Sequence, residues 1–402
     1  MEKKQIPVED LRFGMYVLEL DRPWIGTPFM FQGFPIASDE QIEELKKYCR
    51  HVYIDTERQT HDIRFKGAAV EFRGQPLVRG TTIYRDTAPL EKELPVAKTI
   101  YNTFEKSVQH TLESVRATGD LDPKQVIGIV GKMTRSIERN PDAMILLHRM
   151  QERSNEEFNR AVDNSIHMIT FGRFLQFPSE RLELLGMAGL LLDIGKINLP
   201  EPILRKHDKL TAEEFELSKQ HVMHSVNLIN AVPNLPKGLA DIVLQHHERL
   251  DGSGYPQGLS GNQITIDGAI AGLVNTYCAL ISKRTYAEQA SASNALNMLF
   301  KLRGTLFHDA LVEQLIQCIG IYPVGSAIEL NTGEIGVVIA QNLIRRLQPK
   351  VMLVLDHLWN PIRPQLMLDL VKEPKSSSGE PYRIKRTIPN DQLPIDPHEF
   401  FL

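Results

Sequence analysis

Cysteine is scarce in this chain. Its 402 residues include only three cysteines, Cys49, Cys278 and Cys318, and no two of them are close in sequence. We therefore expect neither a disulfide framework nor a paired-cysteine zinc motif, because both need cysteines at short, characteristic spacings. This usage is typical of a reducing compartment, so we predict a cytoplasmic location.

Long apolar runs are also absent. The sequence contains no stretch of about 18 consecutive apolar residues, so we expect no transmembrane helix. Residues 1–5, Met-Glu-Lys-Lys-Gln, lead into no apolar segment of the kind that a secretory signal peptide needs. We therefore expect a protein that is neither secreted nor embedded in a membrane.

An excess of basic residues is missing as well. The 46 lysines and arginines are outnumbered by 50 aspartates and glutamates, which gives a formal net charge of -4. A chain without a broad positive field is not expected to bind nucleic acid through its phosphates. A local basic pocket for a small phosphate ligand remains compatible with this composition.

The composition is otherwise ordinary for a globular protein, since 42% of the residues are hydrophobic and 24% are charged. The length is enough for two or three domains.

Residues 1–56 predict a small α/β domain, with a strand-turn pattern at 11–18, an amphipathic helix at 38–48 and a strand at 51–55. Residues 57–93 are polar and weakly periodic, which predicts a linker with room for one hairpin.

Residues 94–150 predict helices that connect this region to the next. Apolar residues recur at spacings of three and four over 97–115, and Gly119 is placed to end that helix. Residues 122–123 and 140–141 each combine a capping side chain with a proline, which is a helix-start signal. The apolar stripe of the helix over 97–115 is compatible with a coiled coil in a homodimer and equally with packing within the chain.

Residues 151–322 have a helical pattern almost throughout, and several helices at short spacing predict a compact bundle. Residues 323–371 then carry strand patterns at 327–330, 335–339 and 351–355, and residues 372–402 predict a tail. The predicted fold class is therefore mainly α: a helical bundle with a small N-terminal α/β domain and a small C-terminal β appendage.

The most distinctive stretch is residues 246–256, which read His-His-Glu-Arg-Leu-Asp-Gly-Ser-Gly-Tyr-Pro. Two adjacent histidines end the helical pattern of residues 240–245, and glycines and a proline then indicate a turn. Imidazoles between a helix and a glycine-rich loop can point into a cleft that the loop lines. An isolated His-His pair usually lies on the surface or in a core, but the complete string is rare by chance.

This string resembles the signature of the HD-GYP family, and residues 20–34 resemble the small domain that often precedes HD-GYP domains. The resemblance implies an HD-type helical bundle that hydrolyses cyclic di-GMP with divalent metal ions. It also implies contacts between the Gly-Tyr-Pro loop and diguanylate cyclase domains. The matching loop residues are Asp251, Gly252, Gly254, Tyr255 and Pro256.

The family holds its metals with histidines and carboxylates from several helices, and part of that set is present here. The matching metal ligands are Asp193, His221, His246 and His247. The resemblance also implies a residual catalytic role for Asp193 and Lys196. The residues that match positions linked to the substrate are Lys196, Arg284 and Tyr286.

Three other ligand positions carry a different residue. Arg160 and Leu192 stand where the family has histidine, and Asn275 stands where it has aspartate. Leucine has no lone pair, and arginine carries a permanent positive charge. We predict that Arg160 fills the vacated metal position and pairs with Asp193 or Glu156, because its planar fork suits a carboxylate without a metal.

These replacements leave three functions open. The favoured one is a degenerate HD-GYP protein with no bound cofactor, which senses cyclic di-GMP or binds partner proteins. The alternative is an altered phosphodiesterase that uses one Fe, Mn or other divalent ion on the remaining ligands. The third is a purely structural or dimerisation module. The metal content of the purified protein separates the first two, and cyclic di-GMP binding separates the first from the third.

Overall fold

The structure is a computed structural model that describes residues 3–12, 15–22, 34–36, 39–55, 71–72, 75–76, 78–150, 156–204, 206, 208–282, 292–342, 345–376 and 379–388. The chain divides into two compact units. The helical unit is Gly80–Cys318, and the sheet unit combines the residues up to Arg79 with those from Ile319 onwards. No helix among the described residues combines the length and the hydropathy that crossing a membrane requires.

The N-terminal part of the sheet unit is the small α/β domain that the sequence predicts. Its antiparallel sheet has the order β1-β4-β2-β3, and helix α1 buries Leu45 in the same core as Val17 and Val52. A further pair of strands, β5 and β6, forms the hairpin for which the linker has room. The Trp24 and Phe29 segment lies outside the described residues. The elements are β1 (Lys3–Pro7), η1 (Val8–Asp10), β2 (Tyr16–Leu20), β3 (Phe34–Pro35), α1 (Asp39–Tyr48), β4 (His51–Asp55), β5 (Glu71–Phe72) and β6 (Gln75–Pro76).

The C-terminal part is a five-stranded antiparallel sheet with the order β10-β9-β8-β7-β11. The three inner strands are buried almost throughout, which explains why their apolar runs predict them. The sequence predicts a tail over 372–402, but part of it forms strand β11, which pairs with β7. Strand β10 is not predicted, because most of its side chains are exposed and it has no long apolar run. The elements are β7 (Ala327–Leu330), β8 (Ile335–Ala340), β9 (Lys350–Leu355), β10 (Pro361–Asp369), η4 (Leu370–Lys372) and β11 (Ile384–Ile388).

The helical unit begins with the helices that the capping signals predict. Asp122 accepts a hydrogen bond from the Lys124 N–H at 2.9 Å, and Asn140 accepts one from the Asp142 N–H at 3.1 Å. Gly119 ends α2 in the left-handed conformation, with φ of 78°. The helices are α2 (Leu90–Thr118), α3 (Pro123–Arg139), α4 (Pro141–Arg149), α5 (Glu156–Phe174), α6 (Ser179–Leu191), η2 (Ile194–Asn198), α7 (Glu201–Leu204), α8 (Ala212–Lys219), α9 (His221–Ala231), α10 (Leu239–Gln245), η3 (Gly261–Gln263), α11 (Ile266–Ile281), α12 (Ala292–Leu302) and α13 (Asp309–Ile319).

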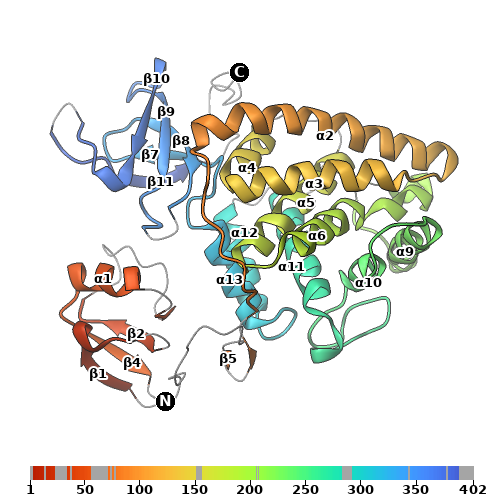
Figure 1. Ribbon diagram of the computed structural model, residues 1–402, viewed down its shortest axis with the longest axis horizontal. Helices are drawn as coiled ribbons and strands as arrows, with labels where there is room; N and C mark the ends of the chain where they lie inside the picture. Colours follow the sequence, from red (N-terminus) through yellow and green to blue (C-terminus); the bar gives the residue numbers. More distant parts are fainter. Residues whose placement is uncertain are drawn as a thin grey trace. The chain divides into compact units, whose positions relative to one another are not determined.

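Helices α5, α6 and α11 form the centre of the helical unit (Figure 1). Helix α5 packs along α6 and against α11, whereas α2 and α3 lie together along one side. Helix α10 packs against α9, α6 and α11. This arrangement brings the end of α6, the start of α9 and the end of α10 to one place.

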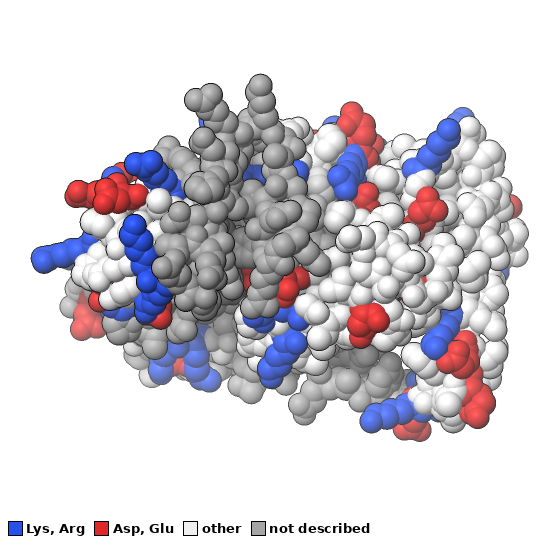
Figure 2. Space-filling model, turned by 90° about the horizontal axis from the view of Figure 1, so that it is seen from below, with Lys and Arg blue, Asp and Glu red and all other residues white. Residues whose placement is uncertain are grey.

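Charges of both signs are mixed on the face of the molecule that Figure 2 shows. Among the described residues in this view, Lys and Arg are interspersed with Asp and Glu and do not gather into one basic field. This distribution fits the net charge of -4. The absence of nucleic-acid binding stays a prediction.

Candidate metal centre

Asp193 lies at the end of α6, directly before η2. The Ser225 hydroxyl on α9 accepts a hydrogen bond from the Gly195 N–H at 2.8 Å and donates one to the Leu192 carbonyl at 3.0 Å. A Cβ atom at Gly195 would lie 2.3 Å from backbone atoms of α9, so only glycine fits there. The close approach of η2 to α9 fixes the position of Asp193.

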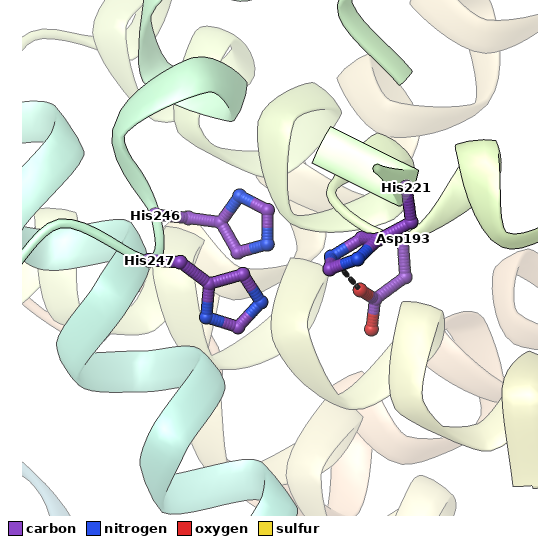
Figure 3. Close-up of side chains that lie close together, drawn as sticks. All are labelled: Asp193, His221, His246 and His247. Carbon is purple, nitrogen blue, oxygen red and sulfur yellow. Dashed lines mark ion pairs between the residues drawn. The ribbon is translucent and has the colours of Figure 1, made fainter. Parts of the chain in front are cut away.

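Three histidines from two helix ends face this carboxylate. His221 is the first residue of α9, and His246 and His247 directly follow α10. The ring centroid of His221 is 5.6 Å from that of His246 and 5.1 Å from that of His247. One ligand atom from each histidine and from Asp193 lies within 4.8 Å of the others (Figure 3). The structure thus brings together the four metal ligands that the sequence retains.

The hydrogen bonds of two of these histidines define their tautomer. Nδ1 of His221 lies 2.6 Å from the Ser218 carbonyl, and Nδ1 of His246 lies 2.6 Å from the Val243 carbonyl. A carbonyl oxygen only accepts, so each Nδ1 carries the proton and donates it. The lone pair is then on Nε2, which in both residues is buried and has no hydrogen-bond partner among the described residues. This is the tautomer that a metal-binding imidazole needs.

Burial keeps the three imidazoles neutral. Burial lowers the pKa of His246 to about 3, and burial together with the neighbouring imidazoles holds the pKa of His247 well below its usual value. The pKa of His221 is also lowered by burial, although Asp193 opposes this shift. Burial by itself would raise the pKa of Asp193, but Lys196 and Arg160 outweigh it and hold that pKa well below its usual range. The site therefore offers three neutral imidazoles and one carboxylate.

Two cations lie on the other side of the Asp193 carboxylate. Its Oδ2 atom is 2.8 Å from Nζ of Lys196 and 3.7 Å from Nη2 of Arg160. Its Oδ1 atom instead faces Nε2 of His221 at 3.4 Å. The predicted pairing of Arg160 with Asp193 is confirmed, whereas the side chain of Glu156 lies outside the described residues.

The other two replaced positions are packed into the helical core. The side chain of Leu192 is fully buried. Asn275 on α11 is also buried, and its Oδ1 accepts a hydrogen bond from the Asn164 side chain at 3.2 Å. Leu192 has no atom that can bind a metal, and the Asn275 amide is engaged with Asn164, so the retained ligands at this site are Asp193 and the three histidines.

The Gly-Tyr-Pro loop forms one wall of the site. The ring of Tyr255 stacks on His247, with centroids 4.6 Å apart and an interplanar angle of 24°. Glu248 is buried and accepts hydrogen bonds from the N–H groups of Gln257 and Leu259, at 2.7 and 2.8 Å. A Cβ atom at Gly254 would lie within 2.5 Å of the backbone of residues 247–249, so only glycine lets the loop approach.

The outer loop residues contribute less to the site. The exposed Asp251 carboxylate accepts hydrogen bonds from the N–H and hydroxyl of Ser253 within the loop. Gly252 has a φ of 81°, which favours glycine. Two of the predicted substrate residues, Arg284 and Tyr286, lie outside the described residues.

An aromatic rim leads from the site to the surface. Phe215 on α8 meets Tyr255 edge to face at 6.3 Å and is 46% exposed. The ammonium group of Lys219 lies 4.9 Å from the centre of the Phe215 ring and 5.3 Å from that of Tyr255. Sequence reasoning missed Phe215, Lys219 and the anchoring role of Glu248. Only Glu248 had a usable signal, because it belongs to the string at 246–256.

A second polar cluster lies inside the helical unit, around Asp163, His167 and Cys278, whose ligand atoms also lie within 4.8 Å of one another. Its carboxylate is already compensated, because Asp163 Oδ1 is 3.1 Å from His148 Nε2 and 3.3 Å from Arg149 Nη2. Burial raises the pKa of the Cys278 thiol well above its usual value, which keeps it protonated. This cluster is a buried ion pair, and the site at Asp193 is the better metal centre.

The donor set around Asp193 fits a single divalent transition metal. Imidazoles suit Fe and Zn, and a carboxylate adds the negative charge that Mn and Fe favour. Without a cation, the Nε2 lone pair of His221 and the Oδ1 lone pairs of Asp193 face each other at 3.4 Å. Buried polar atoms with no partner are rare in native proteins and often indicate an ion. Asp193, His221, His246 and His247 are therefore the residues that would hold one.

Comparisons with known proteins match both the region that contains this site and the N-terminal region. Residues 144–311 match the HD domain profile, and residues 3–126 match a domain of unknown function, DUF3391. A Pseudomonas aeruginosa protein named as a cyclic di-GMP phosphodiesterase is 29% identical over 369 residues, which cover 91% of this chain and 89% of the relative. A Xanthomonas campestris cyclic di-GMP phosphodiesterase response regulator is 37% identical over 36% of this chain and 38% of its own length.

Among solved structures, the chain is similar to an HDG"Y"P protein from Bdellovibrio bacteriovorus. The match has a TM-score of 0.47 and a sequence identity of 15%, and it covers 78% of this chain and 98% of that chain.

Proposed function

We propose that this chain, which contains an HD domain behind a DUF3391 domain, is an altered phosphodiesterase for cyclic dinucleotides that works with one metal ion. The observation that carries the proposal is the convergence of Asp193, His221, His246 and His247 within 4.8 Å. The buried Nε2 atoms of His221 and His246 have no hydrogen-bond partner among the described residues. A four-ligand site of this kind is complete without the three replaced positions.

A divalent ion bound at this site would supply an activated water and neutralise charge on the phosphate. The chain's own residues do the positioning. Asp193 and the three imidazoles define the place of the reaction, and Lys196 holds the carboxylate at 2.8 Å. Burial raises the pKa of Tyr255, so its hydroxyl stays protonated and is able to donate a hydrogen bond to a phosphate oxygen.

The choice of a cyclic dinucleotide rests on two observations. Relatives of this chain are named as cyclic di-GMP phosphodiesterases. The exposed ring of Phe215 beside Tyr255 offers a surface on which a nucleobase can stack, with the Lys219 ammonium close enough to meet a phosphate. The names of the relatives and the chemistry of the rim therefore support a cyclic dinucleotide as the substrate.

Elemental analysis and a hydrolysis assay test the proposal together. We expect the protein purified without chelator to hold one Fe, Mn or other transition-metal ion per chain and to cleave cyclic di-GMP in a metal-dependent manner. His247→Ala should lose both metal and activity, since it removes a ligand. His224→Ala is the matched control, because it removes an imidazole from α9 outside the four-residue group. A protein that holds no metal and cleaves nothing would contradict the proposal.

A second candidate function is a catalytically inactive cyclic di-GMP sensor or protein-interaction module. The Arg160 guanidinium favours it, because a fixed cation 3.7 Å from Asp193 competes with a metal for that carboxylate. In this alternative the protein has no cofactor, and the Gly-Tyr-Pro loop contacts diguanylate cyclase domains. These partners stay predictions.

The triple variant Arg160→His, Leu192→His and Asn275→Asp separates the two candidates. If the unmodified protein holds one metal ion, the variant should hold a second one, because it regains three ligands. If the unmodified protein is metal-free, the triple variant should be the first form to gain metal, and single reversions should gain little because the ligands act as a set. Metal content by elemental analysis decides between these outcomes.

A further inference from the structure

We propose that the Arg160 guanidinium is a built-in cation of this site that binds the phosphate of the substrate beside the metal position. The inference rests on the proposed function and assigns a substrate-binding role to a residue of α5. It makes the site a pair of positive centres, one a metal ion and the other an arginine, on the two sides of Asp193.

The Asp193 carboxylate separates these two centres. Its Oδ1 atom faces the histidines, at 3.4 Å from His221 Nε2. Its Oδ2 atom faces the cations, at 2.8 Å from Lys196 and 3.7 Å from Arg160. A phosphate bound across the carboxylate would therefore meet the metal position on one side and the guanidinium on the other.

The Arg160 guanidinium still has hydrogen bonds to give. Arginine carries five N–H donors in a rigid fork. The distance of 3.7 Å to Asp193 is an ion pair but longer than a hydrogen bond, and Arg160 Nε is buried without a hydrogen-bond partner among the described residues. An unsatisfied buried N–H is costly, so this geometry is suited to a ligand with several acceptor oxygens. A guanidinium binds phosphate or carboxylate oxygens in this way, and the proposed substrate supplies phosphate.

The neighbouring acidic residue of the same helix does not take up these donors. Asp163 lies one turn after Arg160 on α5, but its Oδ1 atom already contacts His148 at 3.1 Å and Arg149 at 3.3 Å. Among the side chains that the structure describes, the carboxylate that Arg160 faces is therefore Asp193. Its side chain is 24% exposed, which leaves a route for a ligand from solvent.

The charge balance of the site also requires an anion. Asp193 contributes one negative charge, whereas Lys196 and Arg160 contribute two positive charges. A divalent ion on Asp193 and the neutral histidines would add two more. A site with this excess of positive charge attracts a phosphate strongly, and each cation lowers the free energy of the bound phosphate group.

The test compares Arg160→Gln and Arg160→Lys with Arg135→Gln, a control that removes an exposed arginine of α3. The probe is inorganic phosphate, whose affinity for the metal-loaded protein is measured by calorimetry, and metal content is measured on the same samples. We expect Arg160→Gln to keep one metal per chain and to weaken phosphate binding about tenfold or more. Arg160→Lys should retain part of the affinity, and Arg135→Gln should bind phosphate as the unmodified protein does.

The outcomes separate this inference from the proposed function. Unchanged phosphate affinity in Arg160→Gln, with metal still bound, overturns the inference and leaves the proposed function standing. A metal-free unmodified protein whose phosphate binding still depends on Arg160 overturns the proposed function and supports the phosphate-binding role of Arg160. A second metal ion in Arg160→Gln would show that the guanidinium only blocks a metal position, and it would overturn the inference. Arg160→Lys keeps the test valid if Arg160→Gln fails to fold.

Discussion

Histidine serves two purposes in the helical unit, and burial sets both. His246 is a candidate metal ligand, and burial lowers its pKa to about 3. His167 lies in the second cluster, where burial lowers its pKa to about 4 and its Nδ1 donates to the Asp163 carbonyl at 2.8 Å. Burial lowers the pKa of both residues, so neither bears a proton on both nitrogens at neutral pH.

His167 should make the stability of the helical unit depend on pH. Its pKa is about 6.5 in the unfolded chain and about 4 in the folded protein. Because the folded pKa is the lower one, protonation favours the unfolded chain, and stability falls as pH decreases from 6.5 towards 4. The loss is about 1.4 kcal/mol per pH unit for one such group. His167→Gln should lower the free energy of unfolding at pH 7.5. It should also make the free energy of unfolding depend less on pH between 6.5 and 4.5, because the group that titrates there is gone.

Urea unfolding followed by circular dichroism at several pH values measures this effect. His110→Gln is the matched control, because His110 is exposed on α2 and its loss should leave the wild-type slope unchanged. Equal pH slopes for His167→Gln and the unmodified protein would contradict the prediction.

At the scale of elements, the close contact between η2 and α9 decides the geometry of the site. Ser225 bridges Gly195 and the Leu192 carbonyl, and this places Asp193 opposite the first residue of α9. The contact depends on the missing side chain at Gly195, where a Cβ atom would lie 2.3 Å from the His221 carbonyl oxygen. The absence of a side chain at Gly195 thus allows the short distance between Asp193 and His221, two candidate metal ligands.

Gly195→Ala should push η2 away from α9. We expect a loss of about 1–3 kcal/mol in the free energy of unfolding, as for other overpacked sites, and a metal affinity reduced at least tenfold because Asp193 moves away from His221. Gly128→Ala is the matched control, since a Cβ atom at Gly128 on α3 meets nothing within 4 Å. That variant should be more stable by about 0.5–1 kcal/mol. Thermal melts and metal titrations that fail to distinguish the two variants would contradict this account.

At the scale of the whole molecule, the candidate metal ligands belong to one of the two units. Asp193, His221, His246 and His247 all lie in the helical unit, whereas both tryptophans, Trp24 and Trp359, belong by position to the sheet unit. A metal ion that binds only the folded helical unit stabilises that unit by mass action. Circular dichroism reports mainly on helices and tryptophan fluorescence reports on the sheet unit, so the two signals separate the units.

Addition of Mn²⁺ should therefore raise the unfolding temperature measured by circular dichroism. At a thousandfold excess over its Kd the ion adds about 4 kcal/mol of stability. The unfolding temperature measured by tryptophan fluorescence should change less, and a chelator should reverse the effect. His247→Ala should lose the response to Mn²⁺, and an equal response in this variant would mean that the ion binds elsewhere.

The sequence predicts most elements whose signal is local. The caps at Asp122 and Asn140 and the glycine at 119 fix the ends of helices, because each acts through its nearest backbone neighbours. The inner strands of the C-terminal sheet are predicted because they are buried along their whole length. Strand β10 is missed because most of its side chains are exposed and it has no long apolar run, and β11 is missed because it pairs with β7, more than 50 residues earlier in the chain.

The same division holds for the site. The sequence by itself determined which candidate ligands are present, namely Asp193 and the histidines at 221, 246 and 247. It also determined at which positions the family's ligand is replaced. Both follow from residue type, which decides what lone pairs a side chain has to give. Only the tertiary structure decided which lone pairs are free and where Arg160 points. These depend on contacts between different elements, such as those of Asp193 with Nε2 of His221 and with Arg160, 33 residues away in the chain. A side chain's direction and its unsatisfied hydrogen bonds are properties of the packed helices, and no local pattern encodes them.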